Sequence, residues 1–190
     1  MRTIVLLSVL GATSLFFFAN TAKADRWNQQ VTLTFSNPVE IPGHLLEPGT
    51  YVFELGLGNT SQYEHIVRVY NKSKDHLYGM FMTIPDHRLT RTNKPVLEFA
   101  ESPVGSPEAI YAWFYPDDKT GHEFVYPKSE AIRLASANNR PVAFMPDELA
   151  PYTSGTDEAG VNAMKQARVK AVTPGGEEVE TITVFGTPAH

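Results

Sequence analysis

The 190-residue chain contains no cysteine. This absence excludes disulfide scaffolds, thiolate metal sites, iron–sulfur clusters and cysteine nucleophiles. Basic residues are also fewer than acidic ones, 16 against 21, so the formal net charge is −5. Because nucleic-acid binding needs a concentrated basic surface, this balance argues against nucleic acid as a partner.

The common catalytic and nucleotide-binding motifs are missing too. The chain has no G-x-S-x-G nucleophile elbow, no H-E-x-x-H zinc motif, no G-x-x-x-x-G-K phosphate loop and no G-x-G-x-x-G fingerprint. We therefore predict no catalytic residue, no metal site and no cofactor. The sequence leaves enzymatic activity open and favours its absence.

The first 24 residues have the pattern of a secretory signal peptide. Arg2 provides the positive start, residues 4–19 are mostly apolar, and Ala22-Lys23-Ala24 is a small-x-small cleavage site. A retained membrane anchor is the alternative, but the apolar run is short for a bilayer core about 30 Å thick. We expect cleavage after Ala24 and export to the periplasm or the cell exterior. No later segment is long and apolar enough for a transmembrane helix, so we expect no membrane span in the mature chain.

After the leader, alternating apolar and polar residues predict an all-β domain. Val31, Leu33 and Phe35 alternate with threonines, which is the pattern of a half-buried strand. Further strand-like runs occupy residues 39–41, 51–55, 66–70, 78–84, 96–100, 110–115, 123–126 and 142–145. The 13 Gly and 14 Pro residues fall mostly between these runs, where turns are needed. We predict an antiparallel sandwich or barrel of about eight or nine strands.

Local signals mark where individual elements should begin and end. Pro85-Asp86 is expected to end the strand at residues 78–84. Ser129 is a candidate N-cap for one short helix, and Asn138-Asn139 is its expected stop. Such a helix would pack over one end of the sheets.

The last part of the chain changes in composition. Residues 147–190 begin with a stretch rich in Pro, Ser, Thr, Gly, Asp and Glu, which is typical of a linker. A weak helix near residues 161–170 and an extra strand near residues 177–185 are candidates within a flexible C-terminal tail. The predicted organisation is therefore a signal peptide over residues 1–24, a β-sandwich domain over 25–146 and a linker with a tail over 147–190.

Three aromatic residues, Tyr111, Trp113 and Tyr115, alternate along one predicted strand. The opposite face is more aliphatic, which favours it as the core face. The three rings would then be partly exposed, where flat amphipathic rings stack on sugars or seat a protein partner. Trp27 is a fourth candidate for this ligand face. The alternative is that both faces are buried and the tyrosine hydroxyls are hydrogen-bonded at the rim.

The histidines offer a weaker pattern. His65, His76 and His87 are spaced 11 residues apart, which would align them in a strand meander and allow a zinc or copper site. Chance spacing of surface histidines is the favoured alternative, because no close H-x-H or H-x₃-H pair is present.

Acidic residues crowd one predicted hairpin. Asp117, Asp118 and Glu123 would supply oxygen ligands for calcium, but their spacing does not match a D-x-[DN]-x-[DN]-G loop, and a solvated turn is favoured. A glycosidase would need two carboxylates at a fixed separation, which the sequence alone does not define.

Several short motifs in the chain are considered together. They are TLTFS at 32–36, PVEIPG at 38–43, LEPGTYVF at 46–53, GSPEAI at 105–110, WFYP at 113–116 and EFVYP at 123–127. Their combination resembles a family of uncharacterised secreted bacterial β-domains, over roughly residues 27–134. The resemblance implies an exported bacterial β-domain and brings no catalytic residues with it.

Together these observations favour an exported, non-catalytic β-domain with a binding or structural role at the cell envelope or outside the cell. Its partner would be an unknown protein, a surface polymer or a second copy of the chain. One alternative is a carbohydrate-binding module that uses Tyr111, Trp113 and Tyr115. A metal- or carboxylate-dependent hydrolase is a further alternative.

Overall fold

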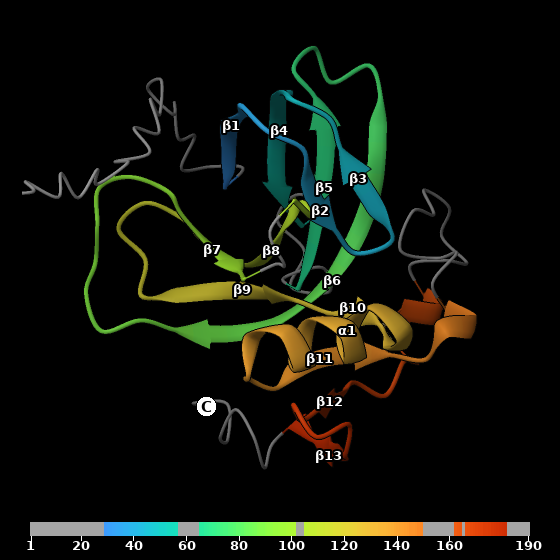
Figure 1. The fold of residues 1–190 in the computed structure, drawn as a ribbon. Coiled ribbons are helices and arrows are strands. Elements are labelled where there is room, and N and C mark those ends of the chain that lie inside the picture. Colours follow the sequence, from blue (N-terminus) through green and yellow to red (C-terminus); the bar gives the residue numbers. More distant parts are fainter. Residues whose placement is uncertain (1–28, 57–64, 102–104, 150–161, 165, 182–190) are drawn as a thin grey trace, which may run out of the picture.

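The computed structural model describes residues 29–56, 65–101, 105–149, 162–164 and 166–181. Strands dominate these residues and form two sheets, while the helices are few and short (Figure 1). The predicted all-β class is therefore confirmed. None of the helices in the described ranges is long and apolar enough to cross a membrane. The predicted signal peptide and Trp27 lie outside the described residues.

The main sheet contains nine strands in the order β1-β4-β5-β6-β9-β8-β2-β3, with β7 paired on β8. These are β1 (Gln30–Phe35), β2 (Val39–Ile41), β3 (His44–Leu46), β4 (Gly49–Leu55), β5 (Ile66–Asn71), β6 (Leu77–His87), β7 (Val96–Ala100), β8 (Glu108–Phe114) and β9 (Thr120–Phe124). All but one of these pairings are antiparallel, since β2 runs parallel to β8. The expected hairpin between β8 and β9 is present, whereas β3 was not predicted.

The long strand β6 divides the main sheet into two halves. Its first part, up to Met82, pairs with β5, and the part from Thr83 onward pairs with β9. In Figure 1 the strands of the first half run roughly vertically, while β9 and the end of β6 run across below them. Side chains from both halves, including Phe53, Phe81 and Trp113, share one core.

The expectation that Pro85-Asp86 ends a strand is wrong, because β6 continues to His87. Beyond Met82, β6 has lost β5 as a neighbour and pairs only with β9. One side of the strand at Pro85 is therefore an edge. Proline is tolerated at an edge because its missing N–H removes no ladder hydrogen bond there.

A second sheet, in the order β10-β11-β12-β13, packs with the only long helix of the described residues. Its elements are β10 (Tyr126–Pro127), α1 (Lys128–Asn138), β11 (Val142–Met145), β12 (Lys170–Val172) and β13 (Glu178–Glu180), with a 3₁₀ turn at Asp147–Leu149. β13 corresponds to the predicted extra strand, and residues 162–164 and 166 are helical as expected. The segment after residue 146 thus contributes two strands that pair with the domain.

The ends of α1 follow the sequence signals only in part. Asn139 adopts a left-handed conformation with φ of 50°, so the predicted stop is confirmed. Ser129 does not cap the helix. Its backbone N–H instead donates to the Asp147 carboxylate at 3.0 Å, and its hydroxyl lies 3.3 Å from the same oxygen. A carboxylate from outside the helix therefore satisfies a free N–H group and complements the helix dipole.

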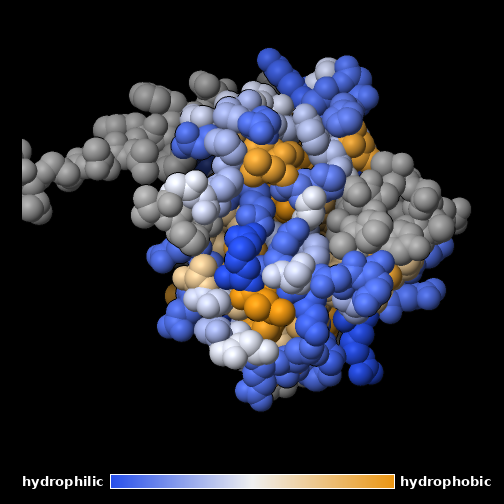
Figure 2. Space-filling view, turned by 45° about the vertical axis from the view of Figure 1, so that its right-hand side comes forward, coloured by the Kyte–Doolittle hydropathy of each residue, from blue (hydrophilic) through white to orange (hydrophobic). Residues whose placement is uncertain are grey.

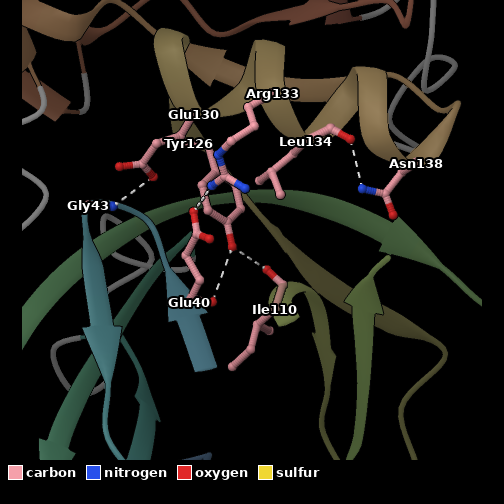
Figure 3. Close-up of polar contacts among 8 residues, drawn as sticks. All are labelled: Glu40, Gly43, Ile110, Tyr126, Glu130, Arg133, Leu134 and Asn138. Carbon is pink, nitrogen blue, oxygen red and sulfur yellow. Dashed lines mark hydrogen bonds and ion pairs between the residues drawn. The ribbon is translucent and has the colours of Figure 1, made fainter. Parts of the chain in front are cut away.

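Polar contacts join α1 and the second sheet to the main sheet (Figure 3). The buried Tyr126 hydroxyl donates to the Ile110 carbonyl of β8 at 2.7 Å. On the β2–β3 turn, the Gly43 N–H donates to the Glu130 carboxylate at 3.0 Å. Glu40 of β2 forms an ion pair with Arg133 of α1. Burial raises the pKa of Tyr126 well above its usual value of 10.0, so the hydroxyl remains a donor.

We predict that Tyr126→Phe lowers the free energy of unfolding by about 1–3 kcal/mol, because the buried Ile110 carbonyl loses its donor. Urea unfolding of the purified protein measures the loss. Tyr51→Phe is the matched control: its hydroxyl donates to the Glu47 carbonyl in a partly exposed place, where water can replace it. Equal losses in the two variants would contradict the assigned role of Tyr126.

Candidate functional site

The predicted aromatic ligand face is inside the molecule. Tyr111, Trp113 and Tyr115 are between 0 and 6% exposed, so the expectation of a partly exposed face is wrong and the alternative of two buried faces applies. The reason is the position of β8, which has β7 along one edge, β9 and β2 along the other, and covered faces. Trp27, the fourth candidate, lies outside the described residues.

The three aromatic rings do not share one face either. The register between β7 and β8 shifts at Tyr111, which leaves this residue as an extra one in a bulge. The Tyr111 hydroxyl interacts with Glu123, whereas the Trp113 ring lies 5.7 Å from the ring of His122. Glu123 and His122 are neighbours on β9 and point to opposite sides of the sheet. Tyr111 and Trp113 therefore lie on opposite faces.

A buried acid, Glu123, lies at the centre of the first of these faces. It is 2% exposed, and its Oε1 atom has no hydrogen-bond partner among the described residues. Burial raises the pKa of Glu123 to about 8. The strongest opposing effect is the hydrogen bond from the Tyr111 hydroxyl, which lowers the pKa. The negative charge of Asp86 raises the pKa further, whereas Arg140 and the Ala143 N–H lower it. The carboxyl group is therefore mostly protonated at neutral pH.

Arg140 and Tyr111 lie next to Glu123. We call Tyr111, Glu123 and Arg140 the Glu123 cluster. The Arg140 guanidinium lies 3.3 Å from the centroid of the Tyr111 ring, a cation–π contact. The Tyr111 hydroxyl donates to the Pro141 carbonyl at 3.4 Å. Burial, and next the Glu123 charge, raise the pKa of Tyr111 far above 10.0. The cluster thus holds a neutral acid and a neutral phenol in the interior, where they serve packing.

On the opposite face His122 is also kept neutral. Burial, and next the nearby His65, lower the pKa of His122 from 6.5 to about 4. The hydroxyl of Thr83 lies 3.4 Å from Nδ1 of His122 and 3.0 Å from the His65 carbonyl. The buried Nε1 of Trp113 has no hydrogen-bond partner within the described ranges. Sequence reasoning did not single out His122, since its importance comes only from its neighbours in space.

The proposed alignment of His65, His76 and His87 is wrong. His76 directly precedes the 11-residue strand β6 and His87 is its last residue, so the two lie at opposite ends of that strand. Across the part of the chain that the structure describes, no group of three or more His, Asp or Glu residues could hold a metal ion. The three acids of the β8–β9 hairpin are also divided, because Glu123 is buried whereas Asp117 is exposed in the turn.

The exposed features are edges and single apolar side chains. Among the described residues the exposed large hydrophobic side chains are Leu45, Leu89 and Ile132. In Figure 2 the apolar surface on the side shown forms small separate areas with hydrophilic residues between them.

Comparison with known proteins adds no family. No protein-family model, no curated protein and no solved structure matches the chain. The functional argument consequently depends on the geometry of this molecule.

The two shifted groups predict a specific pH dependence of stability. Folded Glu123 keeps its proton up to about pH 8, whereas an unfolded glutamate releases it near 4.5, so this group's stabilising contribution is lost as pH rises. His122 has the opposite effect on stability. Folded His122 loses its proton near pH 4 and an unfolded histidine loses it near 6.5, so this group's contribution to stability rises between these two pH values. The two effects oppose each other up to pH 6.5. Above that pH Glu123 is the one of the two that still titrates differently in the folded and unfolded states, and its ionisation lowers stability by about 2 kcal/mol between pH 6.5 and 8.

We predict that Glu123→Gln removes most of the fall in stability between pH 6.5 and 8, because glutamine does not titrate. Urea unfolding at these two pH values measures the change. Glu177→Gln, at an exposed position, is the control and should keep the wild-type difference. A Glu123→Gln variant with the wild-type pH dependence would show that Glu123 is ionised in the folded state.

Proposed function

We propose that the mature chain is an exported, non-catalytic β-domain that binds an extended segment of a protein partner along the outer edge of β1. One observation carries this proposal. β1 is the last strand of the main sheet, and it has no neighbour on its outer side among the described residues. Its six residues include no proline and no charged side chain, the usual devices that block an exposed edge.

The backbone groups that face outward on β1 can be identified. The Leu55 N–H donates to the Gln29 carbonyl at 3.2 Å, and hydrogen-bonded pairs alternate along an antiparallel ladder. Residues 31, 33 and 35 therefore bond to β4, while the N–H and C=O groups of Gln30, Thr32 and Thr34 point outward. The Thr34 hydroxyl lies 3.0 Å from that of Thr50, as expected for a close, non-hydrogen-bonded pair.

The other described edges are less suited to accept a strand. β3 and β13 have three residues each, and β13 carries Glu178 and Glu180. The outer edge of β7 carries Glu98, and the edge of β6 beyond Met82 carries Pro85 and Asp86. Binding by strand addition gains affinity from main-chain hydrogen bonds, so a longer uncharged strand offers more. Among the described edges, β1 combines greater length with the absence of charged side chains.

The interior supports a role without catalysis. Trp113, Glu123 and His122 are all buried or nearly so, and they pack the two faces of the central strands. The burial of Tyr111, Trp113 and Tyr115 also removes the observation that favoured sugar binding. Export rests on the pattern of residues 1–24, and N-terminal sequencing of the chain recovered outside the cytoplasm tests it, with Asp25 as the expected first residue.

The edge proposal is tested with a fluorescent peptide that has the sequence of residues 30–35 and with the variant Thr32→Pro. Proline at position 32 removes an outward N–H and leaves the bonds to β4 intact. We expect the wild-type chain to bind the peptide and Thr32→Pro to bind it at least about tenfold more weakly, measured by fluorescence polarisation.

Thr32→Val is the matched control, because it keeps the N–H group and the strand propensity. It should bind the peptide like the wild type. Urea unfolding verifies that Thr32→Pro remains folded. Equal peptide binding by Thr32→Pro and the wild type, or no binding by either, would refute strand addition at β1.

A further inference from the structure

Two connections project together from one end of the main sheet. They are residues 88–95 between β6 and β7, and residues 115–119 between β8 and β9. In Figure 1 both extend to the left, away from α1 and the second sheet. We call this pair of segments the Leu89 tip.

Hydrogen bonds hold the two segments of the Leu89 tip to each other. The Arg88 N–H donates to the Lys119 carbonyl at 3.0 Å, and Arg88 Nε donates to the Asp118 carbonyl at 3.0 Å. The Asp117 N–H donates to the Thr92 carbonyl at 2.7 Å. The Arg88 guanidinium also lies 5.0 Å from the Phe114 ring. These contacts fix the conformation of the tip, so binding there would cost little conformational entropy.

Leu89 has no packing role in this arrangement. Its side chain is 94% exposed, whereas the two other exposed large hydrophobic residues of the described part, Leu45 and Ile132, are about half-exposed. Placing an aliphatic side chain fully in water is unfavourable, and the held loop prevents it from folding back. Leu89 is available to enter an apolar environment.

The charge around Leu89 differs from that of the rest of the chain. The two segments carry four basic residues (88, 91, 94 and 119) and two acidic ones (117 and 118), a net charge of +2 in a chain of −5. Arg91, Lys94 and Lys119 are exposed, and none of the ion pairs within the described ranges uses them. The two segments of the Leu89 tip therefore present three exposed cations together with the exposed leucine.

We propose that the Leu89 tip docks on an anionic lipid bilayer surface. Leu89 enters the headgroup region, and Arg91, Lys94 and Lys119 meet the lipid phosphates. Each basic residue near an anionic leaflet adds a modest attraction that salt screens, and a buried aliphatic side chain adds a contribution that salt does not screen. An acidic polymer would use the cations alone, so the exposed leucine favours lipid. The tip is remote in sequence from β1, and the proposal holds independently of strand addition there.

Co-sedimentation with vesicles tests this proposal. The probes are vesicles of phosphatidylglycerol and phosphatidylcholine in equal parts and vesicles of phosphatidylcholine alone. We expect the mature chain to sediment with the anionic vesicles only, less so at high salt. Leu89→Glu and the double variant Arg91→Glu/Lys94→Glu should each weaken binding at least about tenfold.

Two controls match these variants. Leu45→Glu changes a half-exposed leucine on β3, and Lys72→Glu reverses an exposed cation in the turn at the opposite end of β6. Both should bind vesicles like the wild type, as should Thr32→Pro. No binding to anionic vesicles, or binding that Leu89→Glu leaves unchanged, would overturn the proposal. Loss with the charge reversals but not with Leu89→Glu would show that the tip adsorbs through charge alone, without insertion of Leu89, and would equally overturn it.

Discussion

Burial of β8 on both faces and along both edges is the constraint on which the rest of the structure depends. From Ala109 to Phe114 this strand offers no exposed side chain, so every polar group near it must be paired or neutral. The Tyr126 hydroxyl satisfies the Ile110 carbonyl, while Glu123 and His122 lose their charges. The aromatic residues of β8 thus stabilise the joint between the two halves of the main sheet and the second sheet.

This constraint moves the search for function from the interior to the periphery. The two surfaces that remain differ in physical character. The edge of β1 offers backbone donors and acceptors and would select an extended chain of almost any sequence. The Leu89 tip offers an aliphatic side chain among cations and would select an anionic apolar boundary. Together, the two proposed surfaces would hold a partner protein close to a membrane.

The sequence predicted the positions of the strands along the chain better than it predicted which residues and strands lie next to them in space. Alternation identified β1 correctly because one face of that strand is core and the other is not. The same rule failed at Tyr111, where a bulge adds a residue. The turn signal at Pro85-Asp86 also failed, because a change of partner strand creates an edge there that tolerates proline. Ser129 lost its capping role to Asp147, 18 residues away. Each failure reflects a neighbour in space that one-dimensional patterns do not contain.

Amide-resolved hydrogen exchange of the protein at low concentration tests the division between a closed interior and an open edge of β1 most directly. The Thr32 amide should exchange rapidly, the Leu33 amide should be protected by its bond to β4, and the amides of β8 should be among the slowest in the protein. Protection of Thr32 equal to that of Leu33 would show that the edge of β1 is already covered. Rapid exchange along β8 would show that the central strand is not enclosed.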